Sequence, residues 1–257
     1  MPELLVATLN VHGKKDRWFE RRELIVSEIV DLQPDIIGLQ EIYRPLGQAR
    51  WLRNQVNSRI IGRSKGLYQL VQRRKRQLIS GYFEGMAVLS KLPVVSVDHL
   101  ALGDGGYLAL RVNVELPTRE TLDFVTLQLD TNMNSKETRL EQVLKLQGWL
   151  YGRDMTPAHI IAGDFSDTPG ELAIQQMKQV YRSTFEEVRG YDPIATYPTA
   201  LLSSRHESSR CLDYIFISSN VGEVVQVNFF CHRPSIRDPK LYPSSHVGLV
   251  SEISLND

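Results

Sequence analysis

The chain has 257 residues, of which 42% are hydrophobic and 23% charged, and its 30 basic and 30 acidic residues give a formal net charge of zero. These values are typical of a globular protein. Its longest uncharged apolar runs are far shorter than the roughly 20 residues of a membrane-spanning helix, so we expect no membrane span. We expect one domain over residues 1–257, because β-rich sandwiches often reach this length as one unit.

Cysteine content and the N-terminal sequence indicate the cellular compartment. Cys211 and Cys231 are the only cysteines, which fits a reduced protein and leaves one disulfide between them open. Met1, Pro2 and Glu3 lead directly into an apolar run, with no basic segment or cleavage site of a signal peptide. We therefore expect a cytoplasmic protein, and we take it to be a monomer.

In chain order, the first half alternates strands with helices. Charge-free apolar runs predict strands, and apolar stripes at helical spacing predict helices. The first half yields a strand at residues 4–9, a helix at 16–31, a strand at 35–39, a helix at 48–59 and strands at 68–71 and 86–89. The first helix is ended by Pro34.

The second half begins with a hairpin and returns to alternation. It yields strands at residues 107–116 and 121–127, a helix at 138–151, a strand at 159–162, a helix at 171–178, and strands at 211–217, 223–230 and 247–253. Strands and helices in this interleaved order predict an α/β or α+β protein in which two sheets pack face to face with helices outside.

Polar residues with catalytic chemistry stand at the ends of these apolar runs. Rigid frames present reactive groups at such positions. In chain order they are Asn10, Glu41, Glu84, Asp164, Asp213 and His246. Hydrolysis of a phosphate ester needs a cation to neutralise the phosphoryl oxygens, a group that activates water, and donors for the developing charge. Carboxylates, an amide and an imidazole are the side chains that supply these functions.

The order of these residues, with Gln40 before Glu41, Gly163 and Phe165 around Asp164, and Tyr-Ile-Phe after Asp213, resembles the endonuclease/exonuclease/phosphatase superfamily. These are the metal-dependent phosphoesterases related to DNase I. The resemblance extends from about residue 4 to about residue 250. It implies a four-layer α/β sandwich of two mixed β-sheets flanked by helices, which patterning alone does not specify.

The resemblance also implies roles for the polar residues. Glu41 is expected to bind Mg²⁺, or Mn²⁺ in its place, with Asn10 beside it to orient a ligand or substrate oxygen. Asp213 is expected to hydrogen-bond His246 and hold its tautomer, and the imidazole to face the scissile phosphate. Asp164 is expected to activate water or to lie next to the phosphate.

The sequence departs from the family pattern at three polar positions. Ser166 stands where the family usually has Asn, Ser245 where it has Asp near the metal, and Gln128 where it has a His paired with the equivalent of Glu84. We expect Gln128 and Ser166 to contact substrate, Glu84 to face an amide, and the Mg²⁺ site at Ser245 to be weakened. Arg139, at a family helix position, is expected either to bind substrate or to pack.

Residues 42–83 contain no Asp or Glu and ten Lys or Arg, a local charge of about +10. This segment favours an anionic partner such as nucleic acid, a phosphorylated metabolite or a lipid headgroup, or else forms a solvated surface.

The motifs support two functional hypotheses. The first is a Mg²⁺-dependent hydrolase of phosphodiesters or phosphomonoesters, nucleic acid included, with an altered or weakened site. The second is an inactive family member that binds a phosphorylated ligand, nucleic acid or protein.

Overall fold

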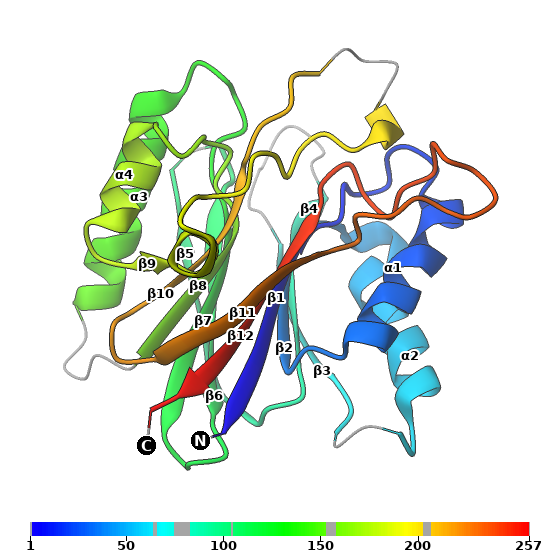
Figure 1. The fold of residues 1–257 in the computed structure, drawn as a ribbon, viewed down its shortest axis with the longest axis horizontal. Coiled ribbons are helices and arrows are strands. Elements are labelled where there is room, and N and C mark those ends of the chain that lie inside the picture. The colour runs from blue at the N-terminus through cyan, green and yellow to red at the C-terminus, as the bar shows by residue number, and fades with distance from the viewer. Residues whose placement is uncertain are drawn as a thin grey trace.

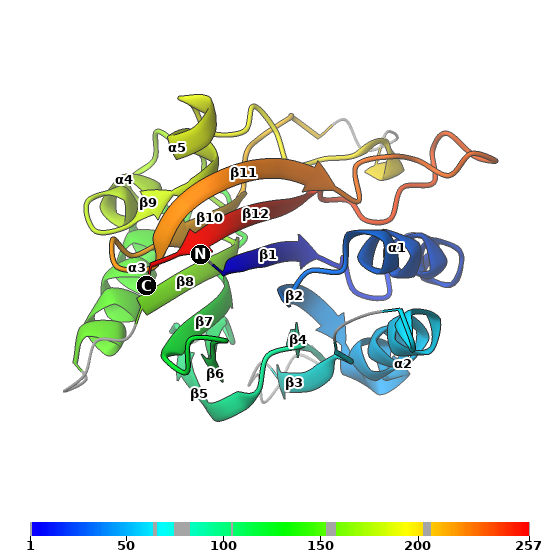
Figure 2. The same cartoon turned by 60° about the horizontal axis from the view of Figure 1, so that its bottom comes forward.

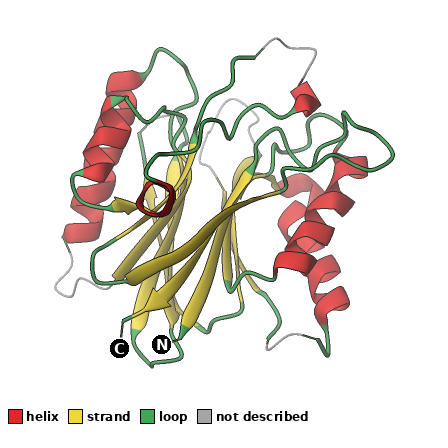
Figure 3. Cartoon of the chain, viewed as in Figure 1, coloured by secondary structure: helices red, strands yellow, loops and turns green. Residues whose placement is uncertain are grey.

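The computed structural model describes residues 2–63, 66–74, 83–103, 105–152, 158–202 and 207–256. Two six-stranded sheets pack face to face, and helices lie on their outer faces (Figures 1 and 3). In spatial order, sheet 1 consists of β11 (Gly222–Phe230), β12 (Gly248–Leu255), β1 (Glu3–Asn10), β2 (Ile36–Tyr43), β4 (Glu84–Ser90) and β3 (Gln69–Arg74). Sheet 2 consists of β5 (Val94–Ala101), β6 (Leu108–Glu115), β7 (Thr121–Gln128), β8 (Ala158–Asp164), β10 (Asp213–Ile217) and β9 (Arg182–Ser183).

Helices complete the four layers, as Figure 2 shows most clearly. Helices α1 (Trp18–Leu32) and α2 (Gln48–Ile60) cover sheet 1, whereas α3 (Lys136–Tyr151) and α4 (Leu172–Lys178) cover sheet 2. A short helix, α5 (Thr184–Arg189), contacts β10 and β11. Each sheet therefore has both faces covered, which explains why its central strands are nearly continuous apolar runs.

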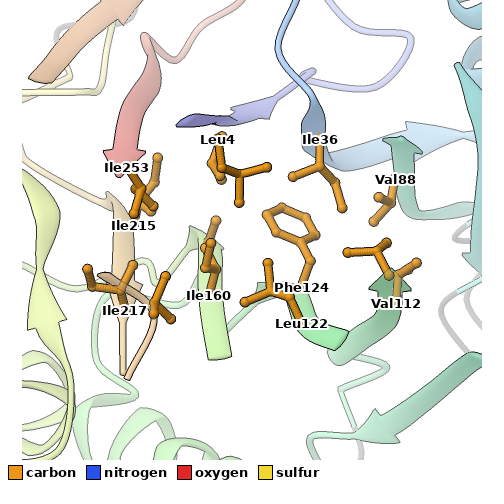
Figure 4. Packing of buried hydrophobic residues seen from close by; sticks show 14 of the residues in the cluster. Leu4, Ile36, Val88, Val112, Leu122, Phe124, Ile160, Ile215, Ile217 and Ile253 are labelled. Carbon is orange, nitrogen blue, oxygen red and sulfur yellow. The ribbon is translucent and has the colours of Figure 1, made fainter. Parts of the chain in front are cut away.

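The main core lies between the two sheets (Figure 4). Ile36 and Val88 from sheet 1 meet Phe124 and Ile160 from sheet 2, and all four are fully buried. Two further clusters bury the outer faces of the sheets against the helices. The core thus holds the two sheets as one frame beneath the loops at their ends.

The sheets approach closely below the site. An added Cβ at Gly38 would lie 2.5 Å from Thr126 Oγ1 of the opposite sheet, so only glycine fits there. The adjacent Gln40 donates from Nε2 to Thr8 Oγ1 at 2.9 Å and to Thr126 Oγ1 at 2.7 Å. Gln40 therefore bridges the sheets directly beneath Glu41.

Strand direction and register bring together the polar residues at the strand ends. The pairs β1–β2 and β7–β8 are parallel, so their carboxyl ends lie at the same edge of each sheet. Asn10 lies opposite Gln40, and Asp164 lies opposite both Gln128 and Asp213. Residues far apart in the sequence are thus positioned by regular backbone.

The structure confirms the predicted α/β class and its two-sheet arrangement. All ten predicted strands overlap strands of the structure, but β5, β9 and α5 were missed, and the strand expected from residue 211 begins at Asp213. Cys211 and Cys231 are both buried and free, so the disulfide that the sequence left open does not form. Among the described residues, no helix is long and apolar enough to cross a membrane.

Candidate active site

The predicted polar residues meet at one end of the two sheets, where the loops after β1, β2, β7 and β8 converge (Figure 1). A cleft of ≈ 350 Å³ opens there. Glu41, Asp164, Ser166 and His246 are among the residues that line it. These four residues, which the sequence singled out, therefore border one common cavity.

Asn10 links two carboxylates. Its Nδ2 donates to Glu41 Oε1 at 3.2 Å and to Asp164 Oδ2 at 2.9 Å, while its Oδ1 accepts from the His12 backbone N–H at 2.9 Å. Glu41 lies at a bulge of β2 with φ of 52°, in the left-handed region that non-glycine residues rarely adopt. Such backbone strain is concentrated at functional sites. Asn10 thus orients both carboxylates across the gap between the sheets.

Gln128 contacts the same two oxygens from the end of β7. Its Nε2 donates to Glu41 Oε1 at 2.9 Å and to Asp164 Oδ2 at 3.1 Å. Two carboxylates this close would repel each other if only solvent separated them. The amides of Asn10 and Gln128 therefore hold together a pair of like charges.

The other oxygen of Asp164 is held by the residue two positions on. Ser166 donates to Asp164 Oδ1 from its backbone N–H at 2.8 Å and from its Oγ at 3.0 Å. Ser166 adopts φ of 52°, so the chain turns back tightly after β8. Four donors thus fix the orientation of the Asp164 carboxylate. The same turn brings the Ser166 side chain to the wall of the cleft.

Asp213 and His246 form a buried pair. His246 Nδ1 lies 2.8 Å from Asp213 Oδ2, as predicted, which leaves Nε2 as the ring nitrogen for a ligand. Thr196 Oγ1 donates to the same carboxylate oxygen at 2.6 Å and accepts from the backbone N–H groups of Leu212 and Asp213. The pair is therefore fixed in orientation from three sides.

Charge around His246 favours its protonated form. Burial opposes protonation of the ring, but the attraction and hydrogen bond of Asp213, together with the charges of Asp164 and Glu41, outweigh burial and raise the pKa of His246 to about 9. In the metal-free protein the imidazole is thus cationic at neutral pH. It is a suitable donor to a phosphate oxygen.

Glu84 begins β4 and faces a lysine that the sequence did not single out. Lys15 Nζ lies 3.5 Å from Glu41 Oε2 and 3.7 Å from Glu84 Oε1. Between these groups lies Gly13, where an added Cβ would come within 3.1 Å of Glu84 Oε1. Lys15 therefore places positive charge beside two carboxylates at the cleft.

A buried arginine holds the loop that carries Lys15. The Arg21 guanidinium donates to the backbone carbonyls of Val11 at 2.6 Å, Gly13 at 2.8 Å and Lys15 at 3.1 Å. It also reaches the Pro243 carbonyl at 3.1 Å, in the segment that leads to His246. Burial lowers the pKa of Arg21 to about 10, so it remains charged at neutral pH. One side chain thus anchors two loops of the site.

Arg139 and Ser245 lie near the cleft in enclosed positions. The Arg139 side chain is only 2% exposed and donates to Asp167 Oδ1 at 3.1 Å and to the Asn132 carbonyl at 2.6 Å. These contacts are those of a packing residue, one of its two predicted roles. Ser245 is fully buried beside His246, and its Oγ has no hydrogen-bond partner among the described residues.

Two residues that line the cleft beside His246 were not predicted from the sequence. The centre of the Tyr197 ring lies 4.8 Å from the centre of the His246 ring, and the Arg210 guanidinium lies 5.6 Å from the Tyr197 ring centre. Tyr197 and Arg210 pair as an isolated β-bridge and both line the cleft. Since they come from a loop, as does Thr196, no strand-end pattern could have revealed them.

Comparison with known proteins agrees with this geometry. The sequence pattern of the Endonuclease/Exonuclease/phosphatase family matches residues 7–246. The chain belongs to this family. No curated protein matches it by sequence.

Several solved structures share the fold of this chain and superpose on it over nearly its whole length. The human Nocturnin catalytic domain with bound sulfate has a TM-score of 0.74 at 20% identity and covers 99% of this chain and 95% of its own. Truncated Caenorhabditis elegans TDP2 has a TM-score of 0.75 at 14% identity, covering 98% and 97%. The endonuclease/exonuclease/phosphatase from Bacteroides vulgatus has a TM-score of 0.78 at 14% identity, covering 100% of both chains. These similarities confirm the four-layer fold.

Members of this family are generally dependent on divalent metal ions. The described residues contain no cluster of three or more His, Cys, Asp or Glu arranged to hold a metal. However, Glu41 Oε2 and Glu84 Oε1 both face the Lys15 ammonium, which stands in for a cation. Mg²⁺ often takes only one or two carboxylates and keeps water or substrate as its other ligands. The residues present fit such an ion.

Proposed function

We propose that the protein is a divalent-metal-dependent hydrolase of phosphate esters, acting on a phosphodiester or phosphomonoester with Mg²⁺ or Mn²⁺. One observation carries the proposal. Glu41, Asp164 and His246, the last buried against Asp213, border a single cleft, although they come from widely separated parts of the chain. Together they supply the ligand, the carboxylate and the cationic donor that the reaction requires.

Glu41 would hold the metal ion. Bound there, the ion would neutralise charge on the phosphoryl oxygens and the leaving group. Asn10 and Gln128 hold Glu41 Oε1 through their amide nitrogens, which directs Oε2 toward the cleft side where Lys15 lies. The two amides thereby orient the ligand without contributing charge.

His246 acts on the phosphate through its free nitrogen. With Nδ1 bonded to Asp213, Nε2 of the cationic ring donates to a phosphoryl oxygen and stabilises the charge that develops there. Thr196 and Asp213 keep the ring oriented, so it need not reorganise during the reaction.

Asp164 and Ser166 line the same cleft as His246 and Glu41. The Ser166 hydroxyl donates to Asp164 Oδ1, and a hydroxyl can exchange that bond for one to water or substrate. A water placed there would have Asp164 as proton acceptor when it attacks the phosphorus. Asp164 is therefore assigned the base and Ser166 the positioning contact.

The basic segment supports a substrate with additional negative charge, such as nucleic acid. Exposed Arg44 follows β2, and Arg74 ends β3 opposite Gly85, at the same end of sheet 1 as Glu84. Other residues of the segment lie elsewhere, since Arg59 pairs with Glu23 at 2.6 Å on the helices. Lys65, Lys75 and Arg76 lie outside the described residues.

A substrate panel tests the proposal. Purified protein would be incubated with bis-(p-nitrophenyl) phosphate, p-nitrophenyl phosphate, plasmid DNA, single-stranded oligonucleotides and sugar or inositol phosphates, with Mg²⁺, Mn²⁺ or EDTA. We expect hydrolysis of at least one substrate that EDTA abolishes and that is lost in Glu41→Gln and His246→Gln. Metal-independent hydrolysis, or hydrolysis that both variants retain, would contradict the proposal.

One observation favours the second candidate, an inactive family member that binds a phosphorylated ligand or nucleic acid. Glu41 and Asp164 are joined by two amides, and Lys15 lies beside Glu41, so the carboxylates are already partnered without a metal. Such a cleft can retain a phosphate without cleaving it. Binding of an oligonucleotide or phosphate ester that persists in EDTA, with no product from any substrate, would support this candidate over the hydrolase.

A further inference from the structure

Lys15 lies at a point of the cleft where two acidic side chains converge. Its ammonium is 3.5 Å from Glu41 Oε2 and 3.7 Å from Glu84 Oε1. The lysine side chain is 49% exposed, whereas the two glutamates are only 13% and 12% exposed. A half-exposed cation thus meets two carboxylates that the protein encloses.

A glycine brings the backbone close to these side chains. Gly13 has φ of +51°, and a Cβ added there would lie 3.1 Å from Glu84 Oε1 and 3.5 Å from the Glu41 carbonyl oxygen. A larger residue would crowd these oxygens. Gly13 therefore borders a small region that is lined by oxygen atoms from two strands.

We propose that Glu41 and Glu84 form one divalent-cation site, and that the Lys15 ammonium occupies it until a metal ion displaces it. The inference rests on the proposed function, because it takes Glu41 as a metal ligand. It adds a second carboxylate ligand, Glu84, and an internal competitor for the site.

The local structure allows this exchange. Arg21 holds the Lys15 backbone carbonyl at 3.1 Å from Nη2, so the loop stays in place while the half-exposed side chain swings away. Neither ammonium contact is within ordinary hydrogen-bond distance, and ion pairs with a solvent-exposed lysine are worth only about 0–1 kcal/mol. A divalent ion with twice the charge can therefore replace the ammonium.

Displacement has a consequence for substrate. Mg²⁺ binds carboxylate oxygens directly, at about 2.1 Å, so an ion held by Glu41 and Glu84 would take the place of the ammonium. Lys15 itself lines the cleft that also contains His246 and Asp164. The released ammonium then faces a phosphate bound in that cleft, where its charge is favourable. Metal and lysine would both place positive charge next to that phosphate.

Metal affinity measured without substrate tests the inference. Metal-free protein is titrated with Mn²⁺, free Mn²⁺ is followed by electron paramagnetic resonance, and Mg²⁺ competition confirms a shared site. Lys15→Met should bind Mn²⁺ about two- to fivefold more tightly than wild type, since the competing ion pair is gone. Lys15→Arg keeps the charge and should bind like wild type.

Lys14→Met is the matched control. Lys14 is adjacent and carries the same charge, but its ammonium lies 4.7 Å from the Tyr43 ring centre. The Lys14→Met substitution should change Mn²⁺ affinity less than twofold. Equal affinities for Lys15→Met and Lys14→Met, or weaker binding in Lys15→Met, would overturn the competition.

Two acidic variants separate this inference from the proposed function. Glu84→Gln should weaken Mn²⁺ binding, and full retention of affinity would overturn the role of Glu84. If Mn²⁺ binds and Glu41→Gln abolishes binding while Lys15→Met behaves like Lys14→Met, the competition alone fails. If wild type and Lys15→Met both bind no Mn²⁺ at millimolar concentration, the metal site of the proposed function fails with it. Thermal melting of each variant confirms that it is folded.

Discussion

The two sides of the cleft differ in burial and in how their charges are balanced. On the imidazole side, formed by Thr196, Asp213 and His246, the Asp213 and His246 side chains are 1% and 7% exposed and directly hydrogen-bonded. On the carboxylate side, formed by Lys15, Glu41 and Glu84, a 49% exposed lysine faces the two glutamates at longer range. The imidazole side is preorganised, and the carboxylate side can rearrange.

This difference indicates how the work of the site is divided. A buried, fixed donor suits a charge that develops at one place in the transition state. A more exposed carboxylate pair with a displaceable cation suits an ion that arrives from solution. Variants on the imidazole side should therefore change turnover, and variants on the carboxylate side should change metal affinity.

The largest effect is expected from His246→Gln. Loss of the cationic donor should lower kcat by about 10²–10⁴-fold on whichever substrate of the panel is hydrolysed, with a smaller change in KM. The control is His12→Gln, which removes the other imidazole of the cleft, hydrogen-bonded to Asp16 at 2.6 Å. Steady-state kinetics of both variants measures the difference. Equal losses in the two variants would contradict the division between the two sides.

Arg21→Met should have the largest effect on stability. Removing the guanidinium leaves the buried carbonyls of Val11, Gly13 and Pro243 without this donor, which should lower the free energy of unfolding by about 2–4 kcal/mol. Arg22→Met is the control, because Arg22 packs over the Trp51 ring at 4.3 Å and the Phe19 ring at 5.1 Å, and its loss should cost about 1 kcal/mol or less. Urea unfolding followed by circular dichroism compares them. Similar midpoints would show that Arg21 does not anchor the loops.

The His246 pair should make stability depend on pH. The folded-state pKa of about 9 lies above the ordinary value of 6.5, so the stabilisation is complete below pH 6.5 and is lost as pH rises through 9. Metal-free protein should lose about 1–3 kcal/mol across this window. His246→Gln should lack that part of the slope. Unfolding at several pH values measures it, and parallel curves for both proteins would refute the charged pair.

The smallest effect is expected from restoring the family pattern at the three substituted positions. Gln128→His, Ser166→Asn and Ser245→Asp together should raise kcat roughly tenfold or more, because each restored donor or ligand can contribute a larger factor. The gains should not add, since Gln128 and Ser166 both donate to Asp164. The assay is the same substrate panel. A folded triple variant that binds metal yet hydrolyses nothing would favour the binding-protein candidate.

The sequence predicted most of the fold because buried strands appear as apolar runs. Where that physical condition is absent, prediction failed. Strand β5 is an edge strand with exposed Val95 and Val97, and its apolar pattern is interrupted by Asp98 and His99. Strand β9 has two residues and α5 has six, too few to show a period.

The site residues likewise fall into those that the sequence predicted and those that it did not. Asn10, Glu41, Asp164 and Asp213 follow from strand ends, because register fixes where a strand end lies. Lys15 and Thr196 lie on loops whose positions depend on Arg21 and on the Tyr197–Arg210 bridge, which no local pattern encodes. Nothing in the sequence distinguishes Lys15 from Lys14, yet one faces carboxylates and the other a tyrosine ring.

The most direct test of the account is a crystal structure with Mn²⁺ and a non-hydrolysable phosphate ester, with the metal located by anomalous scattering. The account predicts an anomalous peak bonded to the Glu41 carboxylate, with a phosphate oxygen within hydrogen-bonding distance of His246 Nε2. A peak away from Glu41, or a phosphate bound out of reach of His246, would contradict it.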